Sequence, residues 1–178
     1  MGVPASAALP IRPSVSLMTD DDKALLIAYL NSARAHVREV LEGVSEEDRR
    51  RPLVPSGWSM VGVVQHLTLD VERFWFRVVM AGEDVPLYTG MDAWQVPADV
   101  TSEQVVETYD RECSIADEII GRTPLSATPV LWREEWGPLE VESLLDVVVH
   151  VIKETATHAG HLDVARELLD GHQHLVMP

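Results

Sequence analysis

The chain is poor in the features that mark secreted and membrane-spanning proteins. Its 178 residues contain a single cysteine, Cys113, so no disulfide can form within the chain, which fits a reducing cytoplasm. No apolar run reaches the roughly 18 residues that a membrane-spanning helix needs. Residues 1–17 lack the charged start and apolar core of a signal peptide. We therefore expect a cytoplasmic protein, not bound to a membrane, with a flexible N-terminal extension over residues 1–18.

Basic residues are also scarce. The chain has 14 Lys and Arg residues against 29 Asp and Glu residues, and its formal net charge is −15. A surface this acidic repels phosphate backbones, and no stretch forms a basic stripe. The charge therefore excludes nucleic-acid binding as the main task and leaves a small-molecule substrate as the expected partner of a monomer or homodimer.

Four long segments carry apolar residues at helical spacing. We expect helices over about 20–42, 60–81, 102–120 and 141–170, with polar caps before them and glycines after them. The connectors 83–100 and 122–138 are irregular, and residues 45–51 form a short capped turn. With no alternating strand pattern, the sequence predicts an all-α four-helix bundle over residues 19–171 and a loose tail over 172–178.

The helix expected at the C-terminal end of the bundle carries closely spaced candidate metal ligands. Glu154 and His158 are four residues apart, so they lie on the same face of a helix. Val151 and Leu162 share that face, which predicts that it points toward the core. A carboxylate facing a core is costly unless it is paired or bound to a cation, and a metal is the most economical explanation.

A third ligand can come from His66 on the helix expected at 60–81. Imidazole and carboxylate groups suit zinc, iron(II), nickel or manganese, and three protein ligands leave a coordination position open for chemistry. The alternative is that His66 and His158 are ordinary buried histidines, with Glu154 as a partner of one of them. The spacing of these residues does not decide between the two interpretations.

Two further residues flank this candidate site. His161 follows His158 by three residues and is either a base at the edge of the pocket or a structural histidine. Asp70 lies one turn after His66 and either orients that imidazole or accepts a proton, unless it is a plain surface charge. We take His161 and Asp70 as the candidate catalytic residues.

For the remaining histidines we favour roles without a metal. His36 either reaches a site or, as we favour, takes a core or boundary position on the first helix. His150 either approaches the candidate site from one turn below or, as we favour, packs or hydrogen-bonds to another helix. His172 and His174 are expected to be exposed in the loose tail.

The connectors supply candidate groups for binding a ligand. Trp58 and other loop tryptophans either line the mouth of a pocket or plug an end of the bundle. Arg133 is a candidate anchor for an anionic substrate. Cys113 lies in the apolar stripe of its helix with no base beside it, so we do not expect it to be a nucleophile.

Several segments in the right order carry a family resemblance. The segments are 59–67, which includes His66, and 71–77, 81–84 and 150–167, which includes Glu154 and His158. Together they resemble the DinB-like metalloprotein superfamily, in particular an actinobacterial subgroup whose members mostly lack an assigned function. The resemblance covers roughly residues 19–171 and implies a four-helix bundle that binds a divalent metal.

The resemblance also implies a ligand set. Many members of the superfamily use three histidines, whereas this chain has Glu154 at the first position of the C-terminal pair. In that respect it is similar to the mycothiol-dependent maleylpyruvate isomerases, where two histidines and a glutamate hold zinc. This implies His66, Glu154 and His158 as ligands, zinc as the first choice of metal with iron or nickel as alternatives, and a low-molecular-weight thiol as cosubstrate.

The leading functional hypothesis is a thiol S-transferase or isomerase of the mycothiol type. A metal-bound thiolate would attack a small electrophilic substrate, and His161 or Asp70 would accept the thiol proton. The same ligands also fit a non-haem iron oxygenase or a metal-dependent hydrolase. A bundle that binds a small molecule without catalysis remains the alternative outside enzymology.

Overall fold

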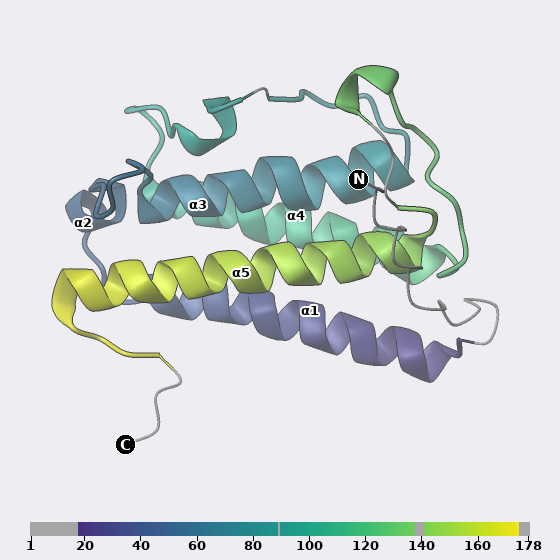
Figure 1. The fold of residues 1–178 in the computed structure, drawn as a ribbon, viewed down its shortest axis with the longest axis horizontal. Coiled ribbons are helices and arrows are strands. Elements are labelled where there is room, and N and C mark those ends of the chain that lie inside the picture. Colours follow the sequence, from purple (N-terminus) through teal and green to yellow (C-terminus); the bar gives the residue numbers. More distant parts are fainter. Residues whose placement is uncertain (1–17, 89, 138–140, 175–178) are drawn as a thin grey trace, which may run out of the picture.

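The computed structural model describes residues 18–88, 90–137 and 141–174, and this part of the chain contains helices and no strand. The long helices are α1 (Asp20–Leu41), α3 (Met60–His66) with its continuation η2 (Leu67–Met80), α4 (Ser102–Arg122) and α5 (Leu144–Asp170). The short ones are α2 (Glu46–Arg50), η3 (Asp92–Trp94) and η4 (Glu134–Trp136). Figure 1 shows the long helices as a bundle, which confirms the predicted all-α architecture.

Polar side chains cap the starts of these helices. The side-chain oxygens of Thr19, Ser45, Ser59, Thr101 and Ser143 each accept a hydrogen bond from a backbone N–H three residues further on. Such caps satisfy donors that have no partner within the helix. The last helix begins at Leu144 and not at 141, because the cap is Ser143. At its other end Gly171 adopts a φ of 75°, a left-handed conformation that suits glycine.

The second long helix differs from the regular helix predicted over 60–81. It is α-helical only as far as His66, and residues 67–80 form a π-helix. At its end the N–H of Ala81 donates to the carbonyl of Phe76, five residues earlier. The i, i+4 periodicity of the sequence does not reveal such a change in winding. Since π-helical turns are frequent at functional sites, the change directly after His66 is notable.

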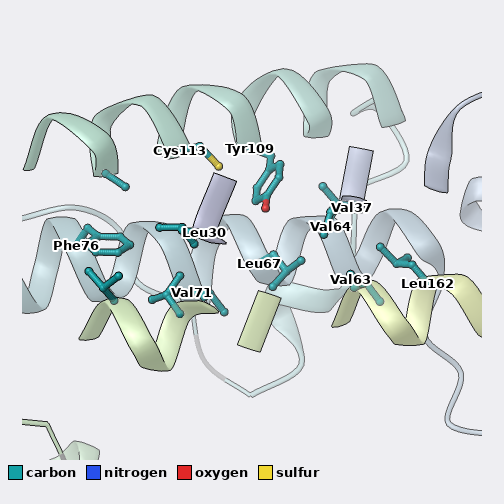
Figure 2. Packing of buried hydrophobic residues seen from close by; sticks show 14 of the residues in the cluster. Leu30, Val37, Val63, Val64, Leu67, Val71, Phe76, Tyr109, Cys113 and Leu162 are labelled. Carbon is teal, nitrogen blue, oxygen red and sulfur yellow. The ribbon is translucent and has the colours of Figure 1, made fainter. Parts of the chain in front are cut away.

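The helices pack around one apolar core. α1 packs mainly on α5, and η2 packs on both α4 and α5, and Figure 1 shows α1 and α5 side by side. Figure 2 shows side chains from all of the long helices meeting in the interior, including Leu30, Leu67, Phe76, Tyr109 and Leu162. The connectors that contain η3 and η4 run along the same side of the bundle, over α3 and η2 (Figure 1). Irregular chain therefore covers the side of the bundle on which α3 and η2 lie.

A buried ion pair crosses this core. The guanidinium of Arg34 on α1 donates to both carboxylate oxygens of Glu72 on η2, at 2.7 and 2.6 Å, and to Asp117 on α4 at 2.6 Å. The side chains of Arg34 and Glu72 are 1% and 0% exposed. Burial acts to lower the pKa of Arg34, but attraction to Glu72 and the hydrogen bonds to Glu72 and Asp117 together outweigh it, so the pKa is raised. Arg34 therefore joins α1, η2 and α4, and the loss of Glu72 would leave its buried charge without a full countercharge.

No helix in the described ranges combines the length and the apolar character needed to cross a bilayer.

Replacement of Glu72 by glutamine should strongly destabilise the bundle. The variant would leave the Arg34 guanidinium buried without its full countercharge, which typically costs about 3–5 kcal/mol. We expect the free energy of unfolding, measured by urea denaturation, to fall by an amount in that range. The control is Arg51→Met, which removes an exposed ion pair with Asp48 and should cost less than about 1 kcal/mol. Equal losses in the two variants would contradict the role given to the buried pair.

Candidate metal centre

His66 is the last residue of α3, directly before η2, and a carboxylate of η2 contacts its ring. Its Nδ1 is 2.9 Å from the Oδ2 atom of Asp70, one turn further on, and its side chain is 14% exposed. A carboxylate at this distance holds the proton on Nδ1 and leaves a lone pair on Nε2. This is the arrangement typical of a histidine that binds a metal through Nε2. The structure thus places Asp70 where it can orient His66.

His158 on α5 lies against His66. The two ring centroids are 4.9 Å apart and the rings meet edge to face. The pKa of His158 is lowered to about 4, chiefly because its burial disfavours the imidazolium, with further contributions from His66 and His161. Glu154 acts in the opposite direction. The ring is therefore uncharged at neutral pH, which is the form that coordinates a metal.

Glu154 lies on α5, one turn before His158. Its Oε2 atom is 3.9 Å from Nε2 of His158, and its Oε1 atom is 3.4 Å from the ammonium group of Lys153. Its side chain is 28% exposed, so it lies at the boundary of the core, less deeply than its apolar neighbours suggested. Among the described residues, the ligand atoms of His66, Glu154 and His158 are not gathered within 4.8 Å of one another. The three-residue metal site therefore stays a prediction, with its members on facing helices.

Trp94 covers this group of side chains and is one of the loop tryptophans that the sequence offered for a pocket mouth or a plug of the bundle. Its ring stacks on His66 with a centroid distance of 4.0 Å and lies 5.5 Å from His158. Two contacts fix the segment that carries it. The amide of Gln65 donates to the carbonyls of Ala93 and Gln95, at 3.1 Å each, and Gly62 lies directly under the carbonyl of Trp94. The length of the connector and the loop position of the tryptophan were signals for this role, but they did not say which tryptophan would meet His66.

His161 and Trp58 lie at the outer edge of the group. Nδ1 of His161 is 3.4 Å from Nδ1 of His158, and His161 is exposed to solvent. Trp58 lies beside it, with ring centroids 6.1 Å apart. The structure thus brings His66, Asp70, Glu154, His158, His161 and Trp58 into one region between η2 and α5.

Arg133 belongs to a different aromatic group. Its guanidinium lies 5.3 Å from the ring centroid of Trp136 and 3.9 Å from the carboxylate of Glu135. Trp136 packs on Phe74, two turns of helix beyond His66. Arg133 therefore lies beside η4 and apart from His66 and His158. A ligand anion that binds it would have to displace or share the carboxylate of Glu135.

A second set of metal-ligand side chains lies on another side of α5. His36 of α1, Asp163 of α5 and His174 each offer a ligand atom within 4.8 Å of the others. We expected His174 to be exposed in a loose tail, but its side chain is 19% exposed and its ring stacks on His36 at 4.1 Å. Ring stacking and polar partners hold it there, and the composition of the tail does not signal such contacts. His172 is exposed, as predicted.

Cys113 offers no nucleophile. Its side chain is buried, and burial raises the pKa of the thiol well above its usual range. A buried thiol that stays protonated is unreactive. This agrees with its predicted place in the core, and any sulfur chemistry must use a thiol from outside the chain.

Replacement of Gly62 by alanine should disturb the cover of the site. The added Cβ would lie 2.5 Å from the carbonyl oxygen of Trp94, a backbone atom that must move. Overpacking of this kind typically costs about 1–3 kcal/mol, so we expect a loss of that size in the free energy of unfolding. The matched control is Gly160→Ala in α5, where a Cβ meets nothing within 4 Å. That change should raise stability by up to about 1 kcal/mol, and a neutral Gly62→Ala variant would refute the close contact.

Comparison with known proteins identifies the family. A family model described as mycothiol S-transferase matches residues 25–171, which is most of the chain. No curated protein and no solved structure matches it. The matched range contains α1 from residue 25 onward, all of the later helices, and His66, Glu154 and His158, whereas His174 lies outside it. The match confirms the resemblance to a mycothiol-related DinB-like family, and the chain belongs to the mycothiol S-transferase family.

Proposed function

We propose that the protein is a cytoplasmic enzyme that transfers a low-molecular-weight thiol of the mycothiol type to a small electrophile. His66, Glu154 and His158 would hold a divalent metal, with zinc as the first choice. The observation that carries this proposal is a pair of imidazole rings whose centroids are 4.9 Å apart. The ring of His66 is oriented by Asp70, and the ring of His158 is uncharged at neutral pH. The family supplies the chemical context for that pair.

The residues present fit a metal of this kind. Two neutral imidazoles and one carboxylate are ligands that zinc, iron(II) and nickel accept, and three protein ligands leave a position open. Bound there, the metal would lower the pKa of a thiol so that the thiolate prevails at neutral pH. The buried Cys113 cannot take this part, which supports a nucleophile supplied by the cosubstrate.

The neighbouring side chains have separate tasks in this proposal. Asp70 accepts the hydrogen bond from Nδ1 of His66 and keeps Nε2 directed away from itself. His161 is exposed and lies beside His158, so it can accept the proton that the thiol loses and pass it to water. The new carbon–sulfur bond forms with the electron pair left on sulfur, while a leaving group departs or the substrate accepts the pair.

Trp94 and Trp58 would shape the entrance. Trp94 covers one face of His66, which excludes water from that side and strengthens the electrostatic interactions beneath it. Trp58 lies beside the exposed His161, where a substrate that enters from solvent would meet it. Arg133 would contact only a ligand long enough to extend from His66 to η4.

Removal of the metal should abolish thiol transfer. We expect protein treated with a chelator to lose its activity with mycothiol and an aryl halide acceptor, and zinc to restore it. His66→Ala and His158→Ala should lower the rate by more than about 100-fold, since each removes a ligand of the centre. The control His172→Ala changes an exposed histidine and should leave the rate unchanged. An undiminished rate in metal-free protein would end the proposal, and iron with oxygen uptake would favour the oxygenase alternative.

Replacement of Asp70 by asparagine should weaken metal binding without removing a ligand. The amide cannot favour the Nδ1 proton as a carboxylate does, and the loss of such a partner typically costs 10–100-fold in metal affinity. We expect an increase of that size in the zinc dissociation constant, measured by competition with a chromophoric chelator. A matched control is Asp170→Asn, which changes a carboxylate paired with Arg166 at the end of α5. An unchanged dissociation constant for Asp70→Asn would show that Asp70 is only a surface charge.

A further inference from the structure

We propose that His36, Asp163 and His174 form a second site for a divalent transition-metal ion, separate from the site between η2 and α5. The three residues come from α1, from α5 and from the segment that follows α5. A metal bound there would tie that segment to the outer face of the helix pair. The proposal does not depend on thiol transfer.

The donor set argues for a transition metal. Nε2 of His36 is 2.8 Å from Oδ1 of Asp163, and the ring of His174 stacks on that of His36 at 4.1 Å. Ligand atoms of all three residues lie within 4.8 Å of one another. Two imidazoles and a carboxylate suit zinc, nickel or copper, whereas calcium and magnesium take oxygen ligands.

The charge around the three residues favours a cation. Glu39 adds a second carboxylate, 3.8 Å from Nε2 of His174. In the described ranges, Asp163 and Glu39 form ion pairs only with these histidines and with no lysine or arginine. A bound cation would therefore neutralise two carboxylates that lack a permanent positive partner. This differs from the core of the bundle, where Glu72 and Glu112 are paired with arginines.

Two of the three ligands border open space. His36 and His174, with Glu39, line a surface pocket of about 360 Å³ that Asp163 does not line, and a water molecule takes about 30 Å³ in the liquid. The side chains of His36, Asp163 and His174 are 19%, 26% and 19% exposed, so they are held in place and still open to solvent. A metal could enter without any opening of the core.

The position of the site suggests a structural task. His36 lies on α1 and Asp163 on α5, two helices that already pack together. His174 comes four residues after the end of α5 at Asp170. Coordination by all three would therefore add a link to α1 and α5 for the segment after α5, which is otherwise held by ring stacking, a long ion pair and hydrogen bonds of His172 and Gln173 to α5.

The experiment uses the full chain with His66→Ala, in which the site of the proposed function lacks a ligand. Metal-free protein is titrated with zinc alone, and bound zinc is measured by equilibrium dialysis and elemental analysis. We expect one zinc per chain at the second site. Adding His174→Ala should weaken this binding by more than about 100-fold, beyond the usual effect of a partner that only orients a ligand. Adding His172→Ala instead, which removes an exposed imidazole two residues before His174, should leave the binding unchanged.

The outcomes separate this proposal from the function proposed above. If the His66→Ala chain binds no zinc, or if His174→Ala and His172→Ala bind it equally, the second site is overturned. If wild-type protein and His66→Ala bind the same amount of zinc, and that zinc is lost with His174→Ala, the second site stands and the proposed catalytic metal fails. His174→Ala in the wild-type chain should keep thiol transfer. As an independent measure, zinc should slow amide exchange of residues 171–174 only when His174 is present.

Discussion

The packing of α5 is the constraint on which both groups of metal-ligand side chains depend. Its buried stripe includes the small residues Thr155, Ala159 and Ala165, which are not exposed at all. Small side chains let α5 lie close to α1 on one side and to η2 on the other. Residues at the edges of that stripe therefore face a neighbouring helix at short range, with His158 opposite His66 and Asp163 opposite His36.

The core beneath these groups is held by charge as well as by apolar packing. Arg34 connects α1 to Glu72 on η2 and to Asp117 on α4, and Arg73 and Arg77 both donate to Glu112 on α4. Buried ion pairs add little net stability, but the loss of one partner is costly. The pairs therefore tie α1, η2 and α4 to one another, and η2 is the continuation of the helix that carries His66. None of them involves α5, so His158 is positioned by the packing of α5 described above.

Much of the architecture follows from local sequence signals. The caps at Thr19, Ser59 and Thr101 and the glycine after α5 mark helix ends through hydrogen bonds between neighbours in the chain, and these were predictable. The π-helix after His66 was not, because i, i+4 periodicity does not distinguish it from a regular helix. The start of α5 was placed three residues too early, although its cap, Ser143, is a local signal of the same kind as the others.

The candidate centre was predictable in part. Glu154 and His158 share one helix, so their spacing alone placed them together. His66 was a candidate third ligand from the sequence, and the family resemblance supported it. The sequence named Trp94 only as one of several loop tryptophans, and it gave no role to His174. Trp94 reaches His66 because Gln65 and Gly62 hold its connector, and His174 reaches His36 because the chain folds back after Gly171. Both depend on contacts between residues far apart in sequence, which composition and spacing do not encode.

The central claim is that a metal lies between η2 and α5, held by His66, Glu154 and His158. Anomalous diffraction at the zinc edge, from crystals of zinc-loaded protein, tests this most directly. The account predicts an anomalous peak within coordinating distance of Nε2 of His66, an imidazole nitrogen of His158 and the carboxylate of Glu154. The absence of a peak there, in crystals whose protein is shown by analysis to contain zinc, would contradict it.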